Sequence, residues 1–269
     1  MAQARQLGRT QGLDQRLQAL RALEQELGDI RQVESGVIID LFLSYRDVKA
    51  WPDMIALVQK MPPPLGATVM VQEQLALALN RNKQGEEAER VLLDLLERRG
   101  PSGETYGILG RVYKDRWVAA LQAGQDFLAR GLLDKAVDAY LKGFEADWRD
   151  AYPGINTVTL MEIRNPPDPG REQLLPVVEY AVNRRIAAGK PDYWDYATLL
   201  ELAVLKKDED KALAALSNGL AVVRWFTFAL SLMVAISLAV EEFLRFGERW
   251  RHYRRMVESL KNDGGQFFN

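Results

Sequence analysis

The chain has 269 residues and a formal net charge of −2, so it can build a large core and lacks the basic excess that is typical of nucleic-acid binding. It has no cysteine, which excludes disulfides and zinc–thiolate sites, and its single histidine, His252, makes a Ser-His-Asp triad hard to build. We therefore expect no metal, no cofactor and no catalytic residues, although catalysis by carboxylates, lysine or arginine stays open.

The N-terminal stretch 1–20 carries arginines but no continuous apolar run, so it is not a secretory signal and we expect a cytoplasmic protein. One segment imitates a membrane span: residues 225–240 carry no charge. A spanning helix needs about 20 apolar residues, so this shorter run instead predicts a buried helix. We expect no membrane association.

Apolar residues recur at helical spacing along the chain, and proline and glycine fall mainly between these segments. No window alternates as a strand does for more than a few residues. The predicted helices span 12–28, 34–47, 51–61, 68–81, 84–98, 103–118, 122–131, 133–146, 152–163, 171–188, 192–205, 208–220, 222–245 and 247–261.

A repeat connects these helices. The pair Leu75-Ala76 recurs 34 residues later as Leu109-Gly110, and Ala88 follows Ala76 by 12 residues. Leu200 and Ala212 show the same spacing of 12. This is the tetratricopeptide spacing, in which small residues stand where two helices cross. Each helix pair has one apolar stripe that only a neighbouring pair can cover, so the spacing predicts an all-α, tetratricopeptide-like solenoid, an α-α superhelix.

The repeat unit that contains Gly110 departs from this spacing. Its second helix is best matched at Ala136 and Tyr140, which implies an insertion of about 14 residues near 118–132 that extends or adds a helix. Prolines in the loop 165–170 mark a joint. The predicted organisation is an N-terminal helix over 1–33, a repeat array over 34–164, a C-terminal half over 165–261 that continues the solenoid, and a disordered tail over 262–269.

Charged residues in the run 109–117 exceed what packing needs. Tyr106, Leu109, Gly110, Tyr113 and Trp117 form one stripe and are assigned to the core. Arg111, Lys114, Asp115 and Arg116 remain, and the first helix of such a repeat lines a concave groove. The preceding helix would add Glu73, Asn80 and Arg81 to this groove. Guanidinium groups such as those of Arg81 and Arg111 suit carboxylates and phosphates. The alternative is an Arg111–Asp115 pair within the helix together with solvated charges.

Two further segments carry candidate residues. In 147–156, Asp150 is expected to cap a helix, Tyr152 either packs or points into the groove, and Asn156 is expected to lock neighbouring helices. The helix 247–261 carries a basic face over 249–255, which is either a solvated cap or a contact surface.

The run LGRVYKDRW over 109–117, followed by AYPGIN over 151–156, resembles the TRAF-binding, tetratricopeptide-like region of the apoptosis signal-regulating kinases, which are mitogen-activated protein kinase kinase kinases. The similarity covers about residues 35–260, and the chain looks like a bacterial member that lacks a kinase domain. TRAF binding is therefore not carried over.

The resemblance implies a non-catalytic regulatory module of a signalling or defence-type system. It is expected to bind a protein partner, such as an effector encoded nearby, through the concave face of the solenoid. The alternative that it implies is a sensor for a nucleotide-like or phosphorylated molecule at Arg111, Lys114, Asp115 and Arg116.

Overall fold

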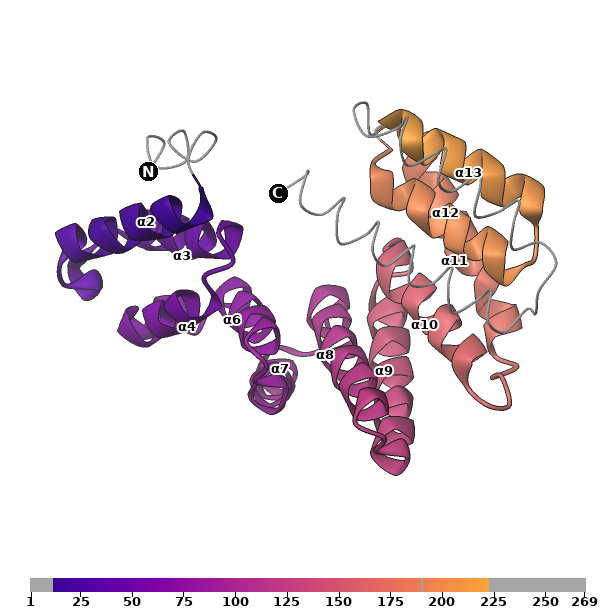
Figure 1. The fold of residues 1–269 in the computed structure, drawn as a ribbon, viewed down its shortest axis with the longest axis horizontal. Helices are drawn as coiled ribbons and strands as arrows, with labels where there is room; N and C mark the ends of the chain where they lie inside the picture. The colour runs from indigo at the N-terminus through magenta and orange to yellow at the C-terminus, as the bar shows by residue number, and fades with distance from the viewer. Residues whose placement is uncertain (1–11, 190, 223–269) are drawn as a thin grey trace. The chain divides into compact units, whose positions relative to one another are not determined.

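A computed structural model describes residues 12–189 and 191–222 (Figure 1). In this part of the chain every regular element is a helix, so the expected all-α helical-repeat class is confirmed. The helices are α2 (Leu13–Leu27), η1 (Ile30–Gln32), α3 (Ser35–Asp47), α4 (Trp51–Lys60), α5 (Pro63–Gly66), α6 (Val69–Arg81), α7 (Gly85–Arg99), α8 (Gly103–Gln122), α9 (Asp126–Ala146), α10 (Ala151–Ile163), α11 (Arg171–Ala187), α12 (Tyr193–Leu205) and α13 (Glu209–Val222).

Most boundaries fall within a residue or two of the expected ones. The two short helices η1 and α5 were not predicted, since three or four residues are too few to show a periodic pattern. The expected helices 222–245 and 247–261, the basic face 249–255 and the tail 262–269 lie outside the described residues, apart from Val222 at the end of α13.

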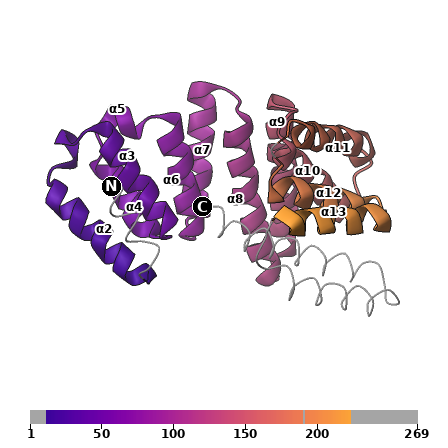
Figure 2. The same cartoon turned by 90° about the horizontal axis from the view of Figure 1, so that it is seen from above.

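Contacts divide the chain into two compact units, residues 1–139 and 140–269. In the first unit, α3 packs against α4, α6 against α7, and α8 against both α6 and α7. These helices follow one another in chain order, as Figure 2 shows for α6, α7 and α8. Contact between α6 and α8 places the first helices of successive pairs side by side, as a helical repeat requires.

The core of the first unit is built from the predicted apolar stripes. Buried side chains of α3, α4 and α6 form one cluster around Phe42, Met54 and Val71. The two small residues of the repeat spacing, Ala76 and Ala88, are fully buried, so small side chains stand at the position that the repeat reserves for them.

The second unit repeats the arrangement with α10 against α11 and α12 against α13. Its core joins Phe144, Ile155 and Val178, which come from both sides of the proline-rich loop, so packing continues across that loop. The division of the chain falls between Ala139 and Tyr140, inside α9, and the loop 165–170 connects two helices of one unit.

Residues 118–132, where the sequence predicts an insertion, belong to the long helices α8 and α9 and the turn between them. Residues expected as a separate helix over 122–131 instead form the end of α8 and the start of α9, with a turn at Ala123–Gln125 between them. Gly124 takes a left-handed conformation in this turn (φ +68°), and the amide of Gln125 donates to the carbonyl of Ala120. No helix within the described residues is long and apolar enough to cross a membrane.

Candidate interaction surface

The first helices α6 and α8 each turn a stripe of residues away from the core. The stripes follow helical spacing: positions 70, 74, 77 and 81 in α6, and positions 104, 108, 111 and 115 in α8. None of these residues belongs to the buried core. We call this surface the first-helix face; it consists of Met70, Gln74, Leu77, Arg81, Glu104, Ile108, Arg111 and Asp115.

Asp115 connects the stripe of α8 to helix α6. Its carboxylate accepts a hydrogen bond of 2.8 Å from Nε of Arg111, one turn earlier in α8. It accepts a second bond of 2.7 Å from Nδ2 of Asn80 in α6. The intrahelical pair that the sequence allowed is therefore present, and a neighbouring helix holds its carboxylate as well.

A second bond fixes α6 against α8 below this face. The hydroxyl of Thr105 donates to the buried carboxylate of Glu73 at 2.6 Å. Together with the Asn80–Asp115 bond it sets the register of the two helices, because the bonds lie ten residues apart along α8. Thr105 was not predicted, since a threonine near a helix start is most simply assigned to a cap.

Lys114 and Arg81, two of the candidate cations, differ in their exposure. Lys114 is only 7 % exposed, so most of its side chain is packed. Arg81 is exposed, but its neighbour Asn80 is the residue that reaches Asp115. Asp115 of α8 therefore accepts a hydrogen bond from an amide of α6, donated by one of the residues that the sequence placed in the groove.

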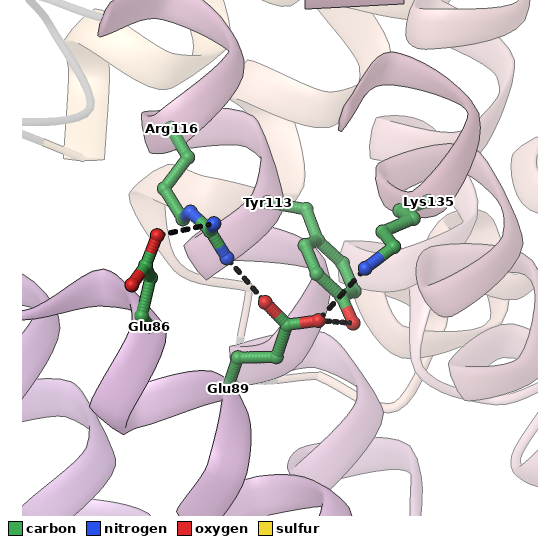
Figure 3. A network of polar contacts seen from close by, with 5 residues as sticks. All are labelled: Glu86, Glu89, Tyr113, Arg116 and Lys135. Atoms are coloured by element: carbon green, nitrogen blue, oxygen red, sulfur yellow. Dashed lines mark hydrogen bonds and ion pairs between the residues drawn. The ribbon is translucent and has the colours of Figure 1, made fainter. Parts of the chain in front are cut away.

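Arg116 does not join Arg111, because it lies on the opposite side of α8, toward α7. Its guanidinium contacts Glu89 and lies 3.4 Å from Glu86 (Figure 3). Glu89 also accepts hydrogen bonds from the hydroxyl of Tyr113 at 2.8 Å and from Nζ of Lys135 at 2.9 Å. We use the name Glu89 network for Glu86, Glu89, Tyr113, Arg116 and Lys135.

The Glu89 network joins side chains of three helices, α7, α8 and α9, at one carboxylate. Burial raises the pKa of Glu89, but the hydrogen bonds from Lys135, Tyr113 and Arg116 favour the charged form and leave the pKa below its ordinary value. Burial and the bond to Glu89 raise the pKa of Tyr113. Nζ of Lys135 also lies 5.1 Å from the centroid of the Tyr113 ring. These contacts give Arg116 a packing role that the run 109–117 does not reveal, since Glu89 lies 27 residues earlier.

The remaining candidates belong to the second unit. Asp150 caps α10 as expected, by accepting from the amide of Tyr152 at 3.0 Å. The ring of Tyr152 is exposed and meets Tyr140 edge-on at 6.0 Å between centroids. Asn156 is buried and donates to the carbonyl of Tyr152 within its own helix at 2.9 Å. Within the described residues, no group of three or more His, Cys, Asp or Glu side chains could hold a metal ion.

Comparison with solved structures supports the repeat assignment. A thermophilic TPR protein from Thermus thermophilus matches 77 % of this chain and 99 % of its own length, with a TM-score of 0.54 and 14 % identity. At this identity the match concerns the fold alone, and the chain has a TPR-like, all-α fold.

Comparison with known sequences gives the family. The chain is 31 % identical to the mitogen-activated protein kinase kinase kinase nsy-1 of Caenorhabditis elegans, over 65 % of this chain and 13 % of the relative. It is 29 % identical to mitogen-activated protein kinase kinase kinase 15 of Mus musculus, over 75 % and 16 %. These matches span less than a fifth of the relatives. The family model of the MAP3K TRAFs-binding domain matches residues 1–249, and the chain therefore belongs to the MAP3K TRAFs-binding domain family.

Proposed function

We propose that the chain is a protein-interaction module that regulates a partner and has no catalysis of its own. Its family is described by the binding of TRAF proteins, and its relatives are signalling kinases. The helical-repeat fold supports this role, because stacked helix pairs offer an extended surface on which another protein can lie. The system it serves is of the signalling or defence type, and its partner is an effector encoded nearby.

The proposed contact surface is the first-helix face, which lines the concave side in solenoids of this kind. The observation that carries the proposal is the bracing of Asp115 by Arg111 and Asn80. A charged pair held by two helices is preorganised, so little side-chain entropy is lost when a partner binds it. Met70 and Ile108 add apolar area to the same face, and such a mixture of apolar and polar groups is typical of protein interfaces.

Charge reversal at Arg111 tests this proposal. The full chain serves as bait in a quantitative pull-down from its source cells, with the proteins encoded beside it followed individually. We expect Arg111→Glu to reduce recovery of the partner at least about tenfold, because it places a second carboxylate beside Asp115.

Arg90→Glu is the matched control. Arg90 is an exposed arginine of α7, paired with Glu87, and it lies outside the first-helix face. Equal recovery with the wild-type chain and Arg111→Glu would contradict the proposal, and so would an equal loss with both variants.

A nucleotide-like or phosphorylated ligand is the second candidate, and the observation that favours it is the presence of Arg111 and Lys114 within one turn of α8. Asp115 and the Glu89 network already take up the charges of Arg111 and Arg116, which favours the protein partner. A thermal-shift screen with nucleotides separates the two. A ligand at 100 times its dissociation constant stabilises the fold by about 2.7 kcal/mol, which the screen detects. A screen in which no nucleotide raises the melting temperature would favour the protein partner.

A further inference from the structure

The helix pair of α12 and α13 repeats the internal geometry of the pair of α6 and α7. Both pairs turn at a lysine in the left-handed region, Lys83 (φ +66°) and Lys207 (φ +58°). When these two lysines are aligned, α6 (Val69–Arg81) coincides with α12 (Tyr193–Leu205) at both ends, and α7 and α13 begin at the same position. In each turn the amide that follows the lysine donates to a carbonyl five residues earlier. The two pairs are therefore equivalent units of the repeat.

α13 carries a row of leucines that the described helices leave partly open. Leu213, Leu216 and Leu220 follow helical spacing, and we call them the leucine stripe. Leu213 is 55 % exposed, and the other two are half-buried. A different side of α13 faces α12, since a Cβ added at Gly219 would lie 3.1 Å from Cβ of Tyr196. The contact within the pair thus leaves the leucine stripe available for another element.

The equivalent stripe of α7 shows which element this is. In the alignment Leu213 takes the place of Glu89, and Leu92, at the position of the second leucine, is fully buried. Glu89 contacts Tyr113 and Arg116, which follow it by 24 and 27 residues and belong to α8, the first helix of the next pair (Figure 3). Position 213 therefore points toward the place where a first helix would follow α13.

The sequence after α13 supplies residues that match this place. Ser237 and Val240 follow Leu213 by 24 and 27 residues, the same separations that join Glu89 to its two partners in α8. Where the first unit pairs an acid with an arginine, these positions hold a leucine and a valine. The exchange is concerted, because an arginine packed against a leucine would lose its ion partner. Both positions belong to the run 225–240, which carries no charge.

We propose that residues 225–240 form a further first helix, which covers the leucine stripe and continues the repeat beyond α13. Residues 100–102 connect α7 to α8, and Val223 and Arg224 separate α13 from the run. So short a connection gives the segment an effective concentration of about millimolar at the stripe. A second copy of the chain at micromolar concentration competes poorly with it. The occupant of the stripe is thus a segment of the same chain.

Introduced cysteine pairs test the contact in the full chain, which has no cysteine of its own. Leu213→Cys, combined with either Ser237→Cys or Val240→Cys, should form a disulfide within one chain under mild oxidation. Asn218→Cys is the matched control, because this exposed residue of α13 lies about 140° around the helix from Leu213. Its pairs with the same two positions should form at least about tenfold more slowly. Equal rates from positions 213 and 218 would overturn the proposal. Disulfides from position 213 that join two chains would also overturn it, since the occupant would then be a second copy.

Hydrogen exchange gives a readout that does not depend on disulfide geometry. The amides of 225–240 should be protected in the full chain, and Leu213→Asp should accelerate their exchange at least about tenfold, because a carboxylate would then face an uncharged helix. Asn218→Asp adds the same charge at the control position and should leave this run unchanged. Exchange of the run at the rate of an unfolded peptide in the unsubstituted chain would overturn the proposal, and so would an equal response to both variants.

Discussion

Asn80 of α6 donates a 2.7 Å hydrogen bond to Asp115 of α8, a residue 35 positions later that also holds Arg111. One carboxylate thus orients the arginine of its own helix and fixes the neighbouring helix beside it. The relationship explains how Arg111 and Asp115, which lie outside the apolar stripe, are held in place.

Asp115→Ala is expected to destabilise the fold more than Arg111→Ala does. Loss of Asp115 leaves the buried amide of Asn80 without this acceptor, which costs about 1–3 kcal/mol. Loss of Arg111 removes a partly exposed ion pair, worth about 0.5 kcal/mol. Urea denaturation of both variants measures the difference, and equal free energies of unfolding would contradict the bracing role of Asp115.

Glu89→Gln is expected to remove a pH-dependent part of the stability. The pKa of Glu89 is lowered in the folded chain: burial raises it, but three donated hydrogen bonds outweigh burial. Its stabilisation is therefore complete above the unfolded carboxylate pKa of about 4.3 and disappears as pH falls through the lower folded value. At neutral pH the variant should lose about 1–3 kcal/mol, and the gap to the wild-type chain should close in acid.

Unfolding followed from pH 7 to pH 3 tests this, with Glu97→Gln as the control at an exposed position of the same helix. A gap between Glu89→Gln and the wild-type chain that stays constant over this range would argue against charge stabilisation.

Gly154→Ala is expected to destabilise the second unit by about 1–3 kcal/mol through overpacking. An added Cβ would lie 2.8 Å from Cγ2 of Val178 and 2.9 Å from Cε2 of Phe144, closer than real Cβ atoms approach. Gly131→Ala is the matched control, because its Cβ would meet nothing within 4 Å. At this exposed position inside a helix, the change from glycine to alanine should stabilise the fold by up to about 1 kcal/mol. Melting temperatures that shift in the same direction would refute this packing.

Lys114→Ala is expected to lower stability by about 1 kcal/mol, because most of the side chain is packed and the variant loses those contacts. A solvated lysine would give no measurable change. Thermal denaturation distinguishes the two, and Lys83→Ala, at an exposed lysine before α7, provides the comparison.

The sequence predicts most helices of this fold because apolar spacing and helix caps are local properties. Asp150 caps α10 as the sequence predicts. Leu109, Gly110, Tyr113 and Trp117 are buried as assigned, whereas Tyr106, assigned to the same stripe, is only half-buried. The break expected after residue 118 is wrong, because 118–122 are good helix formers and the chain turns only at Gly124.

The candidate surface was less predictable, because its contacts join residues that are distant in sequence. Periodicity places Arg111 and Asp115 on one face, and the repeat places Asn80 in the same groove, but neither reveals that Asn80 donates a hydrogen bond to Asp115. Arg116 was grouped with Arg111 because they are close in sequence, and its partner Glu89 lies in another helix. Periodicity also gave no sign that Lys114 would be buried. It indicates the direction in which a side chain leaves its helix, but not how much of that side chain the neighbouring helices cover.

Site-specific photo-cross-linking tests the central claim, that a protein partner binds the first-helix face, most directly. A benzophenone amino acid replaces Met70, which is 38 % exposed on that face, or Leu93, which is 45 % exposed on α7. The account predicts that the partner recovered with the full chain is cross-linked from position 70 and not from position 93. A cross-link from position 93 with none from position 70 would contradict it.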